Sequence, residues 1–294
     1  MASIHEIKTR IKSIKEIKQM TNAMRLISAS KLKRAKHQLE TTLPYFTKIK
    51  STIADILIHS DGVNSSLLGL AHNKEGKKKG YLIISGDSGL AGGYNHNVLK
   101  FTEQILGEDR SSVLFVAGHM GKNYLIRKGY NVDTTFDYHV QDPTIFTARE
   151  IADMLVKYFE DGVLDEVNLI YTMMESSIKF EPRMIKLLPV DPHGLLGESG
   201  ALEMQPHYND TLIYEPSTSA VLEVLIRKYI KGFIYGAFVE SFTSELSARM
   251  AAMDNATQNA DKMLRQLSLQ YNSARQTAIT QEISEIVGGA AALK

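Results

Sequence analysis

Apolar residues recur at alternating intervals of four and three positions along the last quarter of the chain. The repeat begins at Leu246, and residues 217–294 contain no proline. Its members, of which only the threonine is polar, are Leu246, Met250, Met253, Thr257, Ala260, Leu264, Leu267, Tyr271, Ala274 and Ala278. A period of 3.5 residues is typical of helices that supercoil around a partner helix. We therefore predict a C-terminal helix of ~70 residues, ~105 Å long at 1.5 Å per residue, which is longer than a globular domain needs.

The N-terminal segment, about residues 3–58, carries a related pattern and is expected to form a second long helix. Ser3 and Glu6 make a capping-box signature at its start, and the helix should stop near residues 60–62. Pro44 lies inside it and predicts a kink or a local break. The apolar positions follow the heptad and then drift: Ile4, Ile7, Ile11, Ile14, Ile17, Met24, Ile27, Leu32, Ala35, Leu39, Phe46, Ile49, Ile53 and Ile56.

The two long helices flank one central region, so they must be antiparallel if they pair. The second helix is the longer by about one to two dozen residues, and its C-terminal end should therefore extend beyond its partner. That end, residues 285–293, is almost uncharged and consists mainly of small side chains. An apolar surface of this kind is an aggregation hazard unless a partner covers it.

The central region, about residues 78–205, has a different pattern. Short apolar runs typical of buried strands alternate with stretches of helical period, which favours an α/β sheet with helices on its faces. The expected strands are 81–85, 113–118, 167–171 and 185–190, and the expected helices are 97–106, 120–128 and 146–159. The predicted fold is α/β, with a long antiparallel coiled coil and a central Rossmann-like domain. Its predicted divisions are 1–60, 61–208 and 209–294.

Charge is distributed unevenly along a chain whose net charge is only +1. Residues 1–50 hold 12 Lys or Arg against 3 Asp or Glu, a balance of +9, whereas residues 51–216 have a balance of −9. A basic helix of this kind either faces solvent or meets an acidic neighbour. It contains only two aromatic residues, Tyr45 and Phe46, and its apolar stripe is needed for helix pairing, so we expect no nucleic-acid role.

Composition excludes several other classes of protein. An apolar fraction of 44% and a charged fraction of 23% are ordinary for a folded soluble protein. There is no cysteine, which rules out disulfides, thiolate metal sites and cysteine nucleophiles. The most apolar long stretch, 221–239, is interrupted by Arg227, Lys228 and Lys231 and does not predict a membrane span. Residues 1–20 are basic and amphipathic but contain two glutamates, so we interpret them as mature structure.

The strongest candidate for an active site is a glycine-rich turn, residues 85–95, between an expected strand and an expected helix. Phosphates often bind at such places. The turn has neither the Gly-x-Gly-x-x-Gly spacing nor a Gly-Lys-Ser/Thr ending, and glycines also serve tight turns. The nine histidines show no ligand spacing, and Asp87 and Ser88 form no recognisable triad. We expect no catalytic residue, cofactor or metal.

Several motifs resemble the gamma subunits of F-type ATP synthases. Near the C-terminus these are Ala-Arg-Met-Ala-Ala-Met-Asp-Asn-Ala-Thr at 248–257, Arg-Gln-Thr-Ala-Ile-Thr-Gln-Glu at 275–282 and Glu-Ile-Val-Gly-Gly-Ala-Ala at 285–291. Near the N-terminus they are Met-Thr-Asn-Ala-Met at 20–24 and Ser-Ala-Ser-Lys-Leu at 28–32. The resemblance runs from end to end, and an unrelated coiled coil would not place these polar residues in this register.

The resemblance implies a rotor without catalytic sites of its own. In this family the coiled coil turns inside a hexamer of alternating alpha and beta subunits, and the α/β domain rests on the membrane ring of c subunits beside the epsilon subunit. The catalytic sites lie on the beta subunits, and the choice of H⁺ or Na⁺ lies in the ring. The chain is then expected at the cytoplasmic face of a bacterial plasma membrane, bound to the membrane only through the complex.

The resemblance also assigns partner-binding residues. Arg275 and Gln276 match positions that touch a beta-subunit loop, and Arg249 and Thr280 match positions in the same coupling region, with Glu285 close by. Met24 matches a position that faces an acidic lever segment of the beta subunit. Without the resemblance, Met24 would be interpreted as coiled-coil core and the others as ordinary solvent-facing residues.

The glycine-rich turn departs from the family pattern at two positions, because Ser88 stands where many members have arginine and Ala91 where many have cysteine. Two alternatives stay open on the residues alone. One is an α/β nucleotide-binding protein with coiled-coil oligomerisation arms. The other is a scaffold whose long helices pair with a second copy of the chain.

Overall fold

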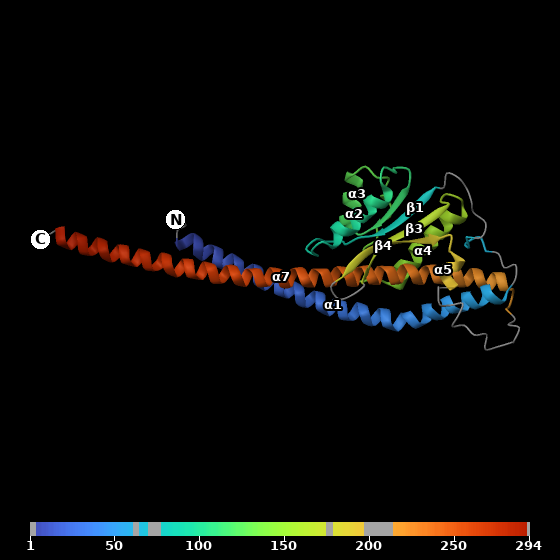
Figure 1. Cartoon of the computed structure of the whole chain (residues 1–294), viewed down its shortest axis with the longest axis horizontal. Helices are drawn as coiled ribbons and strands as arrows, with labels where there is room; N and C mark the ends of the chain where they lie inside the picture. The colour runs from blue at the N-terminus through green and yellow to red at the C-terminus, as the bar shows by residue number, and fades with distance from the viewer. Residues whose placement is uncertain (1–3, 61–64, 70–77, 175–178, 197–213, 293–294) are drawn as a thin grey trace. The chain divides into compact units, whose positions relative to one another are not determined.

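The computed structural model describes residues 4–60, 65–69, 78–174, 179–196 and 214–292. Its elements are α1 (Ile4–His59), β1 (Lys79–Ile84), α2 (Tyr94–Leu106), β2 (Val113–Ala117), α3 (His119–Arg127), α4 (Ile145–Glu160), β3 (Glu166–Met174), β4 (Phe180–Leu188), α5 (Pro192–Leu196) and α7 (Thr218–Ala292), as labelled in Figure 1. Contacts divide the chain into two units. Met1–Ser30 with Arg249–Lys294 forms the coiled-coil unit, and Lys31–Ala248 forms the sheet unit.

A four-stranded sheet organises the sheet unit, with strand order β2-β1-β3-β4. β1 pairs in parallel with β2 and with β3, while β4 pairs antiparallel with β3 at the edge. The runs β1–α2–β2 and β2–α3–α4–β3 are crossovers between parallel strands, which helices normally provide. Pro182 is accommodated in β4 because an edge strand does not need every backbone N–H for pairing.

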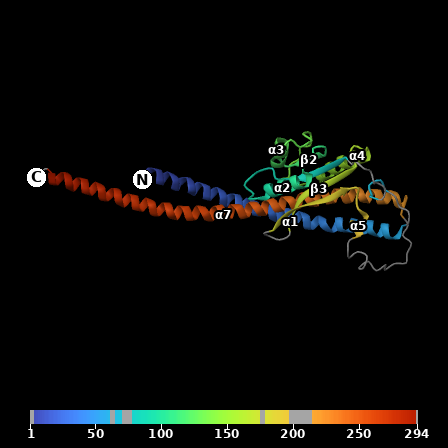
Figure 2. The same ribbon diagram turned by 45° about the horizontal axis from the view of Figure 1, so that its top comes forward.

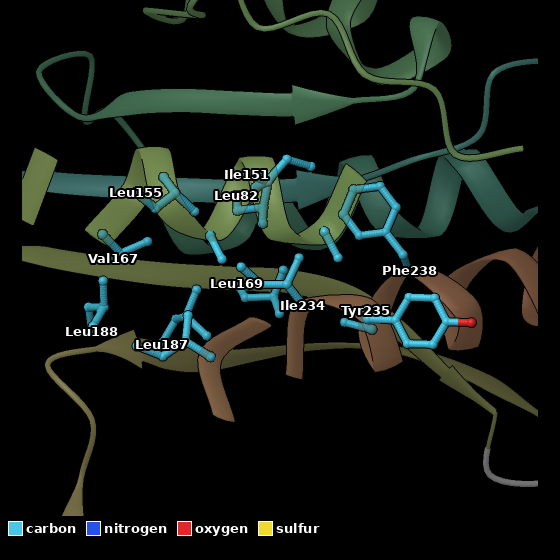
Figure 3. Close-up of a cluster of buried hydrophobic side chains, with 14 of the residues drawn as sticks. Leu82, Ile151, Leu155, Val167, Leu169, Leu187, Leu188, Ile234, Tyr235 and Phe238 are labelled. Atoms are coloured by element: carbon cyan, nitrogen blue, oxygen red, sulfur yellow. The ribbon is translucent and has the colours of Figure 1, made fainter. Parts of the chain in front are cut away.

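Each face of the sheet supports its own hydrophobic cluster. Alternate side chains of one strand point to opposite faces, so Leu82 and Tyr81 of β1 belong to different clusters. α2 and α3 cover the face of Tyr81, as the turned view in Figure 2 lets the reader follow. α4 and the parts of α1 and α7 that belong to this unit cover the other face, where Leu169, Ile151 and Ile234 are fully buried (Figure 3).

Glycine permits a close helix approach at one point of this second cluster. A Cβ atom on Gly232 of α7 would lie 2.0 Å from a ring carbon of Phe46. The Phe46 ring packs against the backbone of α7 there and is 6.4 Å from the ring of Tyr235. A glycine inside a helix costs about 1 kcal/mol relative to alanine, so its presence at 232 is explained by this contact.

The predicted fold class is confirmed, with a mixed sheet and two long terminal helices. The helix expected at about 3–58 is α1, which continues through Pro44, and the helix expected from residue 217 is α7. Two features of the sheet unit were missed. β4 begins five residues before the expected 185, and α5 is not among the expected helices.

The expected divisions near residues 60 and 208 fall at or inside ranges outside the described residues, and they stay a prediction. Among the described helices, none combines the length and the apolar character that crossing a membrane requires.

Candidate partner-binding surface of the coiled-coil unit

In the coiled-coil unit α1 and α7 run antiparallel. The hydroxyls of Thr21 and Thr257 lie 2.8 Å apart, and one turn away Lys18 forms an ion pair with Asp261. Moving three residues back along α1 therefore moves four residues forward along α7. Figures 1 and 2 both show the C-terminal end of α7 continuing past the N-terminus of α1.

The heptad predicted for the C-terminal helix is confirmed. Every member of the series from Leu246 to Ala278 is buried or half-buried, and Met253 and Ala260 are 5% and 4% exposed. On α1 the first four predicted positions, Ile4 to Ile14, are also buried or half-buried. Both helices therefore bury the stripes that their 3.5-residue periods predict.

The predicted N-terminal stripe is wrong at Ile17 and Ile27, whereas its later members from Leu32 to Ile56 are buried or half-buried. Ile17 and Ile27 are 51% and 58% exposed, whereas Thr21 and Ser28 are buried. The heptad continues at its regular spacing and takes polar residues into the interface. Their hydroxyls are satisfied, because Thr21 contacts Thr257 and Ser28 donates to the backbone carbonyl of Met24. Ile17 and Ile27, which lie off this register, are left on the outside of the helix.

Large apolar side chains are exposed on both helices of the coiled-coil unit. On α1 they are Ile17, Met20, Leu26 and Ile27, and on the coiled-coil part of α7 they are Met263, Leu269, Ile279, Ile283, Ile286 and Val287. Their exposed fractions reach 72% at Leu269. Many exposed apolar residues on so small a unit indicate a surface that another protein covers. Sequence reasoning identified only the C-terminal end of this surface, residues 285–293. Keeping the heptad strict from Ile4 onward would also have found the part on α1.

The six partner-binding residues expected from the sequence all belong to this unit, but they do not form one patch. Met24 and Arg249 are half-buried. Arg275 is exposed and lies 26 residues farther along α7 than Arg249, which corresponds to ~39 Å of helix. The surface therefore has two zones, one around the half-buried pair and one near the C-terminal end.

The C-terminal zone presents residues on different sides of α7. Gln276 and Thr280 are exposed and one helical turn apart, on a stripe that continues through Ile283. Glu285 is exposed at a heptad position beyond the last half-buried one, and its carboxylate accepts a 3.0 Å hydrogen bond from the Gln281 side chain. The heptad positions thus become polar where α7 extends past α1, while Ile283, Ile286 and Val287 are apolar and exposed.

Basic residues of α1 lie at the same end of the helix pair, because the N-terminus of α1 runs beside the C-terminal part of α7. Lys8, Lys12 and Lys15 of α1 are exposed, as is Arg10. Only two acidic residues, Glu6 and Glu16, lie in the first 30 positions. This end of the unit therefore presents positive charge to any acidic partner surface.

The glycine-rich turn of the sheet unit is built for packing. The backbone N–H of Gly86 donates to the Asn95 side chain at 2.8 Å, and a Cβ atom on Gly86 would lie 3.1 Å from the carboxyl group of buried Glu245. The hydroxyl of Ser85, also buried, donates to the carbonyl of Ala117. Carboxyl groups lie beside the turn, and the backbone N–H of Gly86 is already hydrogen-bonded within it. Both features disfavour a phosphate ligand.

A cavity beside this turn is much smaller than a nucleotide site. It is lined by Gly93, Tyr94, Asn97 and Thr172 and has a volume of about 90 Å³. Ligand pockets typically measure ~300–1,000 Å³. The arrangement therefore favours a structural role for the turn.

Three raised pKa values in the sheet unit belong to its interior. Burial raises the pKa of Glu240 above its usual value, and the neighbouring Arg183 partly offsets the effect. Burial also raises the pKa of Tyr171 and Tyr229. Desolvation is the leading cause in each case, as expected for groups packed where α7 meets the sheet.

Comparison with known proteins gives consistent matches over the whole chain. A family model described as ATP synthase matches residues 3–293. The ATP synthase gamma chain of Ruminiclostridium cellulolyticum is 55% identical over 293 residues, which are 99% of each chain. That of Acetivibrio thermocellus is 53% identical over 295 residues, covering 100% of both chains.

Solved structures with the same fold come from central stalks. One is the central stalk and c-ring structure of Tetrahymena thermophila mitochondrial ATP synthase, with a TM-score of 0.58 and 22% identity, covering 81% of this chain and 99% of that one. Another is the OSCP/F1/c-ring structure of the Euglena gracilis mitochondrial enzyme, with a TM-score of 0.65 and 14% identity, covering 99% and 94%. The chain belongs to the family of ATP synthase gamma chains, the central rotor stalks of F-type ATP synthases.

Proposed function

We propose that the coiled-coil unit transmits torque to a hexamer of alternating alpha and beta subunits, so that ion flow is coupled to ATP synthesis or hydrolysis. The observation that carries this proposal is the set of large apolar side chains exposed on the outside of the helix pair, from Ile17 to Val287. A surface of this kind suits a sleeve of other subunits, and a shaft needs no active site to change their affinities.

The six residues Met24, Arg249, Arg275, Gln276, Thr280 and Glu285 are the proposed contacts with the beta subunits. Their division into two zones suits two separate places of contact along the shaft. The exposed lysines and arginine at the start of α1 suit an acidic lever segment, because opposite charges attract across a short distance.

The sheet unit is proposed to rest on the c ring beside the epsilon subunit. The chain is proposed to be non-catalytic and to lie at the cytoplasmic face of a bacterial plasma membrane, held there through the complex. The divisions 1–60, 61–208 and 209–294 then separate the two shaft helices from the domain that meets the membrane ring. Nothing in this arrangement calls for a nucleic-acid partner.

Substitution of Met24 tests the proposal. Met24→Lys should impair ATP-driven ion pumping in inverted membrane vesicles while ATP hydrolysis continues, because it adds positive charge beside an acidic lever. Leu43→Lys is the matched control, since Leu43 is 54% exposed on the part of α1 that belongs to the sheet unit. Equal pumping by the Met24→Lys and wild-type enzymes would contradict the assignment of Met24.

Two further measurements address the partners and the alternatives. Native mass spectrometry of the complex isolated from host membranes should show one copy of this chain with three copies each of two larger, nucleotide-bearing subunits. Titration of the isolated chain with ATP should show no tight binding. A homo-oligomer, or a lone chain that holds its own nucleotide, would instead favour the scaffold or the nucleotide-binding protein.

A further inference from the structure

Three side chains of the sheet unit that are far apart in sequence converge on one point. Asp87 follows β1 in the glycine-rich turn, His119 is the first residue of α3, and His139 lies in the loop between α3 and α4. One potential ligand atom from each lies within 4.8 Å of the other two. The histidine rings meet edge to face with their centroids 4.8 Å apart.

The carboxylate of Asp87 is held rigidly and is only partly satisfied. Its side chain is 7% exposed, and Oδ2 accepts hydrogen bonds from the backbone N–H groups of Val140 and Gln141 at 2.9 and 3.1 Å. Oδ1 is buried and accepts no hydrogen bond from the described residues. Leaving such an oxygen without a partner is costly, so the site favours a cation.

The two histidines supply what a cation at Oδ1 would need. Nδ1 of His139 lies 3.5 Å from Oδ1, and both histidine residues are exposed, so an ion can enter from solvent. Ligands at ~2.0–2.1 Å around a tetrahedral Zn²⁺ are about 3.4 Å apart, close to the separation already present. The two backbone hydrogen bonds to Oδ2 fix the carboxylate as outer-shell partners do in metal sites.

We propose that Asp87, His119 and His139 form a binding site for one divalent late transition ion of the Zn²⁺ type. Two imidazole nitrogens and one carboxylate oxygen are ordinary ligands for Zn²⁺, and three protein ligands leave a position for water. A simple ion pair between His139 and Asp87 is the competing explanation, and it assigns no role to His119. The bound ion links the turn after β1, the start of α3 and the loop that precedes α4.

The irregular spacing explains why sequence reasoning expected no metal here. The three residues are separated by 32 and 20 positions, which matches no zinc motif. The sheet brings them together, because β1 and β2 are adjacent and parallel and their C-terminal ends meet at one edge. Asp87 and His119 follow those two ends.

Zn²⁺ titration of the full-length, tag-free chain tests the proposal. After chelator treatment and desalting, the wild type should bind about one equivalent of Zn²⁺ in competition with a chromogenic chelator. His119→Asn, His139→Asn and Asp87→Asn should each weaken binding at least about tenfold. Asp87→Asn keeps one side-chain oxygen that can accept the hydrogen bonds from the backbone N–H groups of Val140 and Gln141.

His96→Asn is the matched control, because His96 is exposed in the same unit and lies outside the cluster. It should bind Zn²⁺ as the wild type does. Zn²⁺ should raise the midpoint of thermal unfolding of the wild type and of His96→Asn. It should leave the midpoint of the three cluster variants unchanged. The absence of wild-type binding, or equal binding by all variants, would overturn the proposal. Melting without metal checks that each variant is folded.

Discussion

The sheet unit and the coiled-coil unit use their apolar residues in opposite ways. In the sheet unit large side chains such as Leu82, Leu155 and Leu169 are fully buried between strands and helices. In the coiled-coil unit polar Thr21 and Ser28 are buried in α1 while Ile17 and Ile27 face outward. The first unit builds a fully buried core and also exposes apolar side chains such as Phe146, whereas the second, in proportion to its size, exposes more of its large apolar side chains.

This difference shows where function is located in the molecule. The residues of a fully buried core are explained by the stability that their packing provides, which requires no partner protein. Exposed apolar side chains beside polar interface positions such as Thr21 do not stabilise the isolated chain, so its stability does not explain them. They become reasonable once the chain is the rotor of a larger complex, because the subunits around it complete their burial.

Substitution of one leucine in each unit should give the largest difference in the free energy of unfolding. Leu169→Ala in β3 should lower the free energy of unfolding by about 2–5 kcal/mol, because Leu169 is fully buried and a cavity remains. Leu269→Ala in α7, where the side chain is 72% exposed, should change it by no more than about 0.5 kcal/mol. Urea unfolding of both variants measures this. Comparable losses would mean that Leu269 is buried in the isolated chain.

The pair of Thr21 and Thr257 tests the polar contact across the coiled-coil unit. Thr21→Val and Thr257→Val should each cost about 1 kcal/mol, because each leaves the other hydroxyl without its partner across the helices. The double variant should cost less than the two single variants together, by at least about 0.5 kcal/mol. Strict additivity in this double-mutant cycle would show that the two hydroxyls do not interact.

Substitution of Asp109 tests how much hydrogen bonds to a side-chain carboxylate stabilise the sheet unit. Its carboxylate accepts hydrogen bonds from the hydroxyls of Ser112 and Ser111 and from their backbone N–H groups, which holds its pKa well below the ordinary 3.8. Asp109→Ala should destabilise the protein by about 1 kcal/mol at neutral pH.

The sign of its pH dependence follows from the lowered pKa. Because the folded state keeps Asp109 ionised where the unfolded state protonates it, this stabilisation is present above pH 3.8 and is lost as pH falls toward the lowered pKa. Asp109→Asn should therefore lose less stability than the wild type on acidification below pH 3.8. Parallel pH profiles from thermal melts of the two proteins would refute this role.

The ion pair between Lys18 and Asp261 should give the smallest effect. Its side chains are 40% and 42% exposed, so solvent screens the attraction. Lys18→Gln should cost less than about 1 kcal/mol, and the difference from wild type should shrink at high salt. A large effect that does not depend on salt would show that the pair is more buried than this.

The sequence predicts the long helices and the sheet unit well because periodicity reports which face is buried. The heptad of α7 is correct to each position, from Leu246 to Ala278. The same reasoning failed at Ile17, because it followed hydrophobicity and took every isoleucine to face the partner helix. The heptad spacing continues along α1 while the interface residues change from apolar to polar. Only contacts such as that of Thr21 with Thr257 reveal this change.

The cluster of Asp87, His119 and His139 could not be predicted for a different reason. Its members come from three segments that only the sheet topology brings together, and no local spacing encodes it. The partner-binding residues were assigned by resemblance. The structure adds that they lie in two zones of the coiled-coil unit, and their contacts with the beta subunits stay a prediction.

Protection of single cysteines on assembly tests the central claim most directly. The chain has no native cysteine, so Ile283→Cys and Phe146→Cys each introduce one reactive thiol, at sites 56% and 71% exposed in the two units. Maleimide labelling of this chain is measured by mass, alone and assembled with the alpha and beta subunits. Assembly should strongly slow labelling at 283 and leave 146 unchanged. Equal labelling at 283 in both states would contradict a shaft enclosed by those subunits.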